Sequence, residues 1–138
     1  MSRFNILVFE DTPERIDALR ERLSTVALHE YGCEIGLSVC MNADTLEQDL
    51  IATWHLILVD DDLGNGLRGD NVINDIVKIL NQDIDSMNLP IIYYSSGTTH
   101  QELQSRSRRF GLGRIPCMSS DDLFDSIIGR IRTLYAAH

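Results

Sequence analysis

Positive charge is scarce in this sequence. Its 138 residues include 12 Lys and Arg against 21 Asp and Glu, which gives a formal net charge of −9, and Lys78 is the only lysine. General binders of nucleic acids or anionic membranes neutralise phosphate with clustered Lys and Arg. The composition therefore argues against both functions and favours a cation or a basic protein as the partner.

Cysteine pairs and long apolar segments are missing as well. The three cysteines, Cys33, Cys40 and Cys117, form no C-x-x-C pair and lie too far apart in the chain to indicate a zinc site, so we expect reduced core thiols. No apolar stretch approaches the roughly 18 residues of a membrane span, and the first residues lack the apolar segment of a signal peptide. These absences predict a cytoplasmic protein without a membrane-bound part.

The length and composition are those of one globular domain. The sequence is 43% hydrophobic and 24% charged, close to the average for soluble domains, which argues against disorder and against a disulfide scaffold. We expect a single domain over residues 1–138. Only residues 136–138 follow the last expected helix, so no effector domain is expected.

The segment over residues 56–62, Leu-Ile-Leu-Val-Asp-Asp-Asp, organises the rest of the sequence. Its apolar run is typical of a strand buried on both faces of a parallel sheet. Such a strand delivers Asp60 to its C-terminal edge, where ligands bind in open α/β sheets. We expect Asp61 to face solvent. Residues 4–9 repeat the pattern, because they too form an apolar run that ends in acids.

Strand and helix patterns alternate five times along the chain. We expect strands over residues 4–9, 33–40, 56–60, 90–94 and 114–118, and helices over about 13–29, 44–51, 71–80, 100–110 and 120–134. The fifth strand is the weakest, since Pro116 cannot donate to a ladder. The alternation predicts an α/β fold, a (βα)5 doubly wound five-stranded parallel sheet with the flavodoxin-like order 2-1-3-4-5.

This strand order gathers polar residues at one edge of the sheet. The first, third and fourth strands would bring together Glu10, Asp11, Asp60, Asp62 and Ser95. Crowded carboxylates repel one another unless they take up protons or share a cation, and Mg²⁺ fits as the cation because it uses few carboxylates and keeps several waters. A metal there would let Asp60 act as a nucleophile, and Ser95 could donate to a phosphoryl oxygen. The residues thus predict phosphoryl transfer onto a carboxylate, with Asp60 favoured as the acceptor.

Three segments carry a resemblance to a known family. Residues 5–11, 56–60 and 90–96 read Asn-Ile-Leu-Val-Phe-Glu-Asp, Leu-Ile-Leu-Val-Asp and Pro-Ile-Ile-Tyr-Tyr-Ser-Ser. In this order the sequence resembles, over nearly its whole length, the receiver domain of two-component response regulators. The resemblance implies a signalling domain rather than an enzyme, with self-phosphorylation and autodephosphorylation as its only reactions.

The resemblance also implies roles for the matching residues. Asp60 would accept a phosphoryl group from a histidine kinase or a histidine phosphotransfer protein of a phosphorelay. Glu10, Asp11, Asp60 and the backbone carbonyl of Asp62 would hold Mg²⁺, and Ser95 would be the switch hydroxyl. A downstream protein partner would bind the fourth helix, fifth strand and fifth helix. The sequence leaves the oligomeric state open, a homodimer included.

The sequence departs from the family pattern at several positions. The family's lysine at the end of the fifth strand falls on Cys117 or Met118, and Lys78 lies inside the third helix. Arg114 could replace the lysine or could be an ordinary surface arginine. Gly64 stands where the family often has proline, and the loop to Gly69 is one residue longer than usual.

Two alternatives stay open, of which the absent lysine favours only the first. The first is a degenerate pseudo-receiver that binds proteins without being phosphorylated. The second is a phosphohydrolase of the haloacid dehalogenase type, suggested by the Asp60-x-Asp62 spacing alone. A basic cluster also has two interpretations, a solvated helix face or a docking patch for an acidic partner; it consists of Arg106, Arg108, Arg109 and Arg114.

Overall fold

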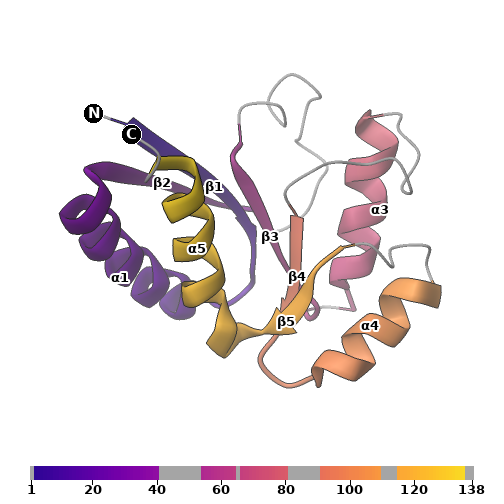
Figure 1. Ribbon diagram of the computed structural model, residues 1–138. Helices are drawn as coiled ribbons and strands as arrows, with labels where there is room; N and C mark the ends of the chain where they lie inside the picture. The colour runs from indigo at the N-terminus through magenta and orange to yellow at the C-terminus, as the bar shows by residue number, and fades with distance from the viewer. Residues whose placement is uncertain (1, 41–53, 65, 81–90, 110–114, 136–138) are drawn as a thin grey trace.

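Five parallel strands form the centre of the computed structural model, which describes residues 2–40, 54–64, 66–80, 91–109 and 115–135 (Figure 1). The strands are β1 (Ser2–Phe9), β2 (Cys33–Cys40), β3 (Leu56–Asp60), β4 (Ile91–Ser95) and β5 (Cys117–Ser119). They lie in the order β2-β1-β3-β4-β5, and every pair is parallel. The predicted fold class and strand order are therefore confirmed.

Helices cover both faces of this sheet. The helices are α1 (Pro13–Tyr31), α3 (Gly69–Leu80), α4 (His100–Arg109) and α5 (Leu123–Tyr135), with a short 3-10 helix η2 (Ser120–Asp122) before α5. In Figure 1, α1 and α5 lie on one face of the sheet, and α3 and α4 lie on the other. The helix expected near residues 44–51 falls outside the described residues.

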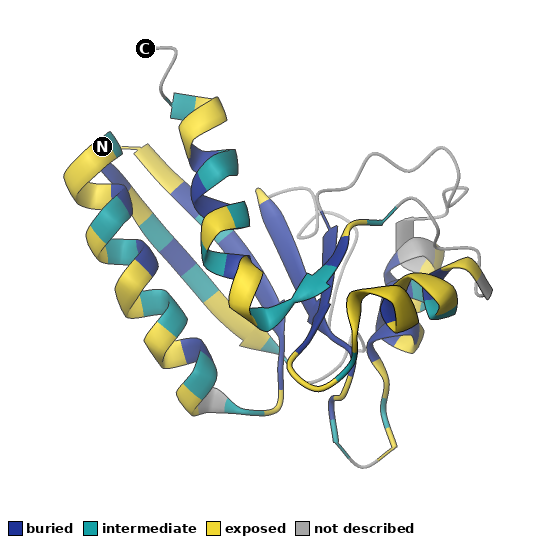
Figure 2. Ribbon diagram, turned by 60° about the horizontal axis from the view of Figure 1, so that its bottom comes forward, coloured by how far each residue is buried: buried dark blue, intermediate teal, exposed yellow. Residues whose placement is uncertain are grey.

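The core has one apolar cluster on each face. Strand side chains alternate between the two faces, so β3 gives Ile57 and Val59 to the α3 and α4 side and Leu56 and Leu58 to the α1 and α5 side. Every residue of β3 and β4 is buried, as Figure 2 shows for the centre of the sheet. An apolar run with no polar interruption suits these positions, because helices cover both faces of the strand.

The end of α1 and the start of β5 differ from the expected ranges for local reasons. Helix α1 continues to Tyr31, where Gly32 ends it in the left-handed conformation (φ +61°) and donates its N–H to helix carbonyls. The fifth strand begins at Cys117, after Pro116, instead of at residue 114. Pro116 contributes only its carbonyl, which accepts the N–H of Tyr93 at 2.9 Å.

Among the helices of the described residues, none combines the length and apolar character needed to cross a membrane.

Candidate functional site

The C-terminal edge of β1 and β3 brings three carboxylates together. The register pairs Phe9 with Val59, so Glu10 follows β1 beside the Asp60 that ends β3. One carboxylate oxygen from each of Glu10, Asp11 and Asp60 lies within 4.8 Å of the others. Glu10 and Asp60 are buried, whereas Asp11 is exposed. The structure thus joins three of the predicted site residues into one cluster with an open side.

These three acids fit a hard divalent cation. Two carboxylates buried side by side repel each other unless a cation or a proton neutralises them. Carboxylate oxygens are the ligands that Mg²⁺ uses, and the exposed Asp11 leaves room for the waters that Mg²⁺ keeps. Gly64 borders this side: it has φ +76°, and a Cβ added to it would lie 3.1 Å from Asp11 Oδ2.

The surroundings of Asp60 favour its protonated form. Burial, followed by the hydrogen bond and the negative charge of Glu10, raises the pKa of Asp60 to about 8. The backbone N–H of Asp62, 3.3 Å from Asp60 Oδ1, and the charge of Arg15 act in the opposite direction. A bound cation would favour the carboxylate form, so proton and cation compete for the same group.

Tyr94 and Arg15 complete this cluster, although the sequence pattern predicts neither of them there. The Tyr94 hydroxyl donates to Glu10 Oε2, and burial followed by the charge of Glu10 raises the pKa of Tyr94, so its proton stays in place. Arg15, in the first turn of α1, places Nη1 3.4 Å from Glu10 Oε1 and 3.8 Å from Asp60 Oδ2. One guanidinium group therefore faces both buried acids.

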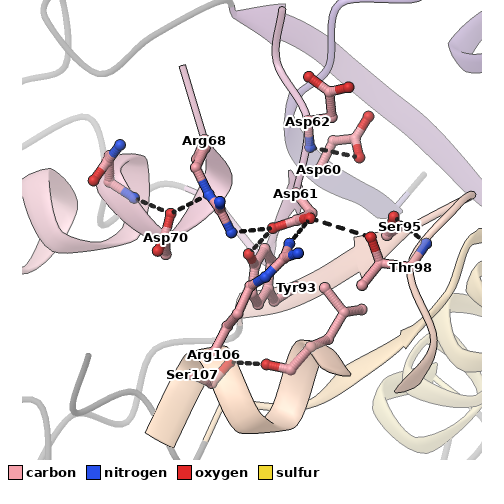
Figure 3. A network of polar contacts seen from close by, with 12 residues as sticks. Asp60, Asp61, Asp62, Arg68, Asp70, Tyr93, Ser95, Thr98, Arg106 and Ser107 are labelled. Carbon is pink, nitrogen blue, oxygen red and sulfur yellow. Dashed lines mark hydrogen bonds and ion pairs between the residues drawn. The ribbon is translucent and has the colours of Figure 1, made fainter. Parts of the chain in front are cut away.

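Asp61 does not face solvent, so that expectation is wrong. It is 5% exposed, and its carboxylate accepts hydrogen bonds from the Tyr93 hydroxyl and from the Arg106 guanidinium group of α4 (Figure 3). Thr98 Oγ1 adds a third contact at 3.4 Å, and Arg68 Nη2 lies 3.9 Å away. A buried carboxylate needs such partners, and they come from β4, the loop after it, α4 and the residue before α3.

The side chains of the remaining predicted residues, Asp62 and Ser95, hold the loops that follow β3 and β4. Asp62 is exposed, and its Oδ1 accepts the Gly64 N–H at 3.0 Å, as in an Asx turn. Ser95 is buried one position beyond Tyr94, which is the register partner of Asp60. Its Oγ accepts the backbone N–H groups of Gly97 and Thr98 at 3.2 and 3.0 Å, so it orders the loop before α4.

A glycine is needed at position 69 because the chain packs closely there, and not because of a positive φ. In the loop after β3, Gly64 and Gly66 do have positive φ, +76° and +77°. Gly69 instead begins α3 against the end of β3, where an added Cβ would lie 2.2 Å from the carbonyl oxygen of Asp60. The absence of a side chain at Gly69 therefore lets the helix start beside the backbone of Asp60.

No cation occupies the fifth-strand position of the family's lysine. Cys117 pairs in register with Tyr93 and joins the core on the α3 and α4 side, where its Sγ lies 3.3 Å from Ser107 Oγ. Met118 pairs with Tyr94 and packs on the α1 and α5 side. Lys78 is exposed in the last turn of α3, and Arg114 falls outside the described residues.

The two tyrosines at the end of β4 are a sequence signal for these buried contacts. A buried tyrosine needs a partner for its hydroxyl, and adjacent strand residues point to opposite faces. Tyr93 and Tyr94 are both 0% exposed, and they meet Asp61 on one face and Glu10 on the other. A hydroxyl at the end of a central strand next to acid-terminated strands indicates such pairs.

Solved structures of receiver domains are similar to this fold. The N-terminal domain of a response regulator/sensory box/GGDEF three-domain protein from Carboxydothermus hydrogenoformans has TM-score 0.58 and 16% identity, covering 96% of this chain and 97% of its own. The signal receiver domain of a modulated diguanylate cyclase from Desulfovibrio desulfuricans G20 has TM-score 0.54 and 21% identity, covering 94% of each chain. A response regulator receiver domain from Rhodospirillum rubrum has TM-score 0.51 and 17% identity, covering 94% and 89%.

Sequence comparison adds no family assignment. No protein-family model matches the chain, and no curated protein matches it. At identities of 16 to 21%, the similarity concerns the fold. The chain has the flavodoxin-like fold of response regulator receiver domains, and the resemblance seen in the sequence is confirmed at that level.

Proposed function

We propose that this protein is a response regulator that accepts a phosphoryl group on Asp60 from a histidine kinase or a histidine phosphotransfer protein. The main support is the position of Asp60, which ends the central strand within 4.8 Å of the carboxylates of Glu10 and Asp11. The receiver fold supports a signalling role and not that of a classical enzyme.

The proposed reaction forms one bond and breaks one. A carboxylate oxygen of Asp60 attacks the phosphorus atom of the donor, and a P–O bond forms. The bond from phosphorus to the donor histidine nitrogen, or to the acetate oxygen of acetyl phosphate, breaks, and its electron pair stays with the leaving group. The Asp62 N–H holds Asp60 Oδ1, while Oδ2 faces Arg15, so the protein fixes the orientation of the carboxylate.

The acid cluster is the proposed magnesium site. Glu10, Asp11 and Asp60 would hold Mg²⁺ with the backbone carbonyl of Asp62. When bound, the ion would supply positive charge that ionises Asp60 and neutralises phosphoryl oxygens. Since Asp60 has a pKa of about 8 without a cation, much of it is protonated at neutral pH. Phosphoryl transfer should therefore require Mg²⁺.

The proposed output surface comprises α4, β5 and α5. Ser95 would donate its hydroxyl to a phosphoryl oxygen and release the N–H groups of Gly97 and Thr98, which would move the loop that leads into α4. Among the described side chains of helix α4, only Leu103 and Ser107 are buried, so few apolar contacts oppose a shift. A downstream protein would bind the shifted surface.

Intact mass after incubation with acetyl phosphate and Mg²⁺ tests this proposal. We expect wild type and Asp75→Asn, whose carboxylate lies exposed on α3, to gain one phosphoryl group, and Asp60→Asn to gain none. Equal labelling of wild type and Asp60→Asn would contradict Asp60 as the acceptor. A wild type that neither acetyl phosphate nor a phosphorylated histidine kinase labels would contradict phosphoryl transfer altogether.

One observation favours the alternative function of a phosphorylation-independent binding module. The apolar Met118 lies on the Asp60 face of β5, so the fifth strand supplies no charge to a phosphoryl group there. Under this alternative the chain would bind its protein partner equally well as wild type and as Asp60→Asn, with or without acetyl phosphate.

A further inference from the structure

We infer that Arg15 is the residue that pairs with the phosphoryl group on Asp60; this inference rests on the proposed function. A phosphorylated aspartate carries two negative charges in place of one, and it would lie beside the buried Glu10. Such a group needs a positively charged hydrogen-bond donor in addition to a metal. Among the described residues, Arg15 is the cation that forms an ion pair with Asp60.

The other nearby arginines are already engaged. Arg106 donates to Asp61, and Arg68 lies between Asp61 and Asp70 at 3.9 and 3.6 Å, both on the opposite face of the sheet. The family's lysine position offers Cys117 or Met118, neither of which carries positive charge. Within the described part of the chain, the positive charge beside Asp60 therefore comes from Arg15 of α1.

The contacts of Arg15 are long, so its guanidinium group can form shorter hydrogen bonds with a phosphoryl group. Strong charged N–H···O bonds measure about 2.7–2.9 Å, whereas Arg15 Nη1 stands 3.4 Å from Glu10 and 3.8 Å from Asp60. Its side chain is 38% exposed and lines a cavity of about 330 Å³ together with Tyr94, Ser120 and other residues of α1 and α5. The guanidinium fork has room to turn, and its geometry suits two phosphoryl oxygens.

The position of Arg15 is fixed by the start of its helix. Pro13 occupies the first turn of α1, and the Arg15 N–H donates to the Thr12 carbonyl at 3.2 Å. The acids at the end of β1 and the guanidinium group are thus only a few residues apart in the chain. The arrangement needs no contribution from β5.

Labelling kinetics of Arg15 variants test this inference. At saturating Mg²⁺, we expect acetyl phosphate to label Arg15→Gln at least about tenfold more slowly than wild type, the loss expected for a charge-assisted hydrogen bond in the transition state. Arg15→Lys should recover part of the rate. The matched control is Arg20→Gln on the same helix, because Arg20 pairs with the exposed Asp17 and should label like wild type.

A second readout does not depend on labelling. Titration calorimetry with Mg²⁺ alone should show tighter binding to Arg15→Gln, because a positive charge has left the neighbourhood of two ligands. An unchanged affinity would overturn the placement of Arg15 at the site. If Arg15→Gln binds Mg²⁺ more tightly but labels at the wild-type rate, Arg15 is only a counter-ion of the acids, and the inference is wrong while the proposed function stands. If neither acetyl phosphate nor a phosphorylated histidine kinase labels the wild type, the proposed function and this inference are both wrong.

Discussion

The guanidinium group of Arg106 on α4 pairs with the carboxylate of Asp61, the residue that follows Asp60. The side chains of these two consecutive aspartates thus point to opposite faces of the sheet, since Asp60 faces Arg15 of α1. The hydrogen bond to Asp61 raises the pKa of Arg106, so its charge is secure. The chain beside the proposed acceptor is therefore tied directly to α4, the helix of the proposed output surface.

Removing Arg106 should destabilise the fold. Arg106→Ala would remove the nearer of the two cations beside the buried Asp61, and we expect a loss of about 1–3 kcal/mol in the free energy of unfolding by urea denaturation. The double variant Arg106→Ala/Asp61→Asn should lose less free energy of unfolding than the two single variants lose in sum, because the two residues share one interaction. Arg108→Ala, an exposed neighbour on α4, should change stability by less than about 0.5 kcal/mol. Additive losses would show that the pair does not form in solution.

Asp60→Asn should stabilise the metal-free protein, and more so as pH rises. The unfolded chain releases the Asp60 proton near its ordinary pKa of about 3.9, whereas the folded protein keeps it until the pKa of about 8. Between these values the unfolded state binds fewer protons, so stability contributed by protonated Asp60 is full at low pH and falls as pH rises. The asparagine removes this loss.

Urea denaturation with a chelator at about pH 5 and about pH 8 measures this effect. We expect the advantage of Asp60→Asn over wild type to grow by at least about 1 kcal/mol between the two pH values. Asp17→Asn, whose side chain is 69% exposed, should show no such growth. An advantage that is the same at both pH values would mean that Asp60 is not held protonated by its surroundings.

Gly69→Ala should disturb the end of β3. Its Cβ would lie 2.2 Å from the Asp60 carbonyl oxygen and 2.9 Å from Tyr93 Cε1, so the start of α3 has to move. We expect a loss of about 1–3 kcal/mol in the free energy of unfolding. Gly129→Ala on α5 meets no atom within 4 Å and should stabilise its helix by up to about 1 kcal/mol. If Gly69→Ala proves as stable as wild type, the close packing of α3 against β3 is wrong.

Magnesium should stabilise the folded protein through Glu10. Calorimetric titration should show a Mg²⁺ affinity at least about tenfold lower for Glu10→Gln than for wild type, because a ligand charge is lost. Asp17→Asn, away from the cluster, should bind like wild type. Thermal unfolding should show a rise in Tm with Mg²⁺ that a chelator reverses, since the ion binds only the folded state. Equal affinities of wild type and Glu10→Gln would contradict the proposed metal site.

The sequence predicted the fold well because the pattern is local. Apolar runs that end in acids mark β1 and β3, and their alternation with amphipathic helices is enough to give the strand order. It also predicted that Glu10, Asp11 and Asp60 meet, because parallel strands bring their ends to one edge. The predicted start of the fifth strand, residue 114, is three residues too early. Pro116 bonds to β4 only through its carbonyl, and the sequence does not show this.

The partners of the acids could not be predicted in the same way. Whether Asp61 turns to solvent or to the core depends on contacts with Tyr93 and Arg106, which are 32 and 45 residues away in the chain. Sequence spacing places a residue on a face, but it does not show which distant cation reaches it. For the same reason Arg106 was grouped with a basic surface cluster, whereas its side chain is 25% exposed and paired.

Locating the phosphoryl group is the most direct test of Asp60 as the acceptor. Borohydride converts an aspartyl phosphate to homoserine, so peptide mapping by mass spectrometry after labelling and reduction identifies the modified residue. We predict homoserine at position 60, the end of β3, and unmodified Asp61 and Asp62 in the same peptide. Homoserine at position 61 or 62, or a labelled peptide that does not contain Asp60, would contradict the proposed function.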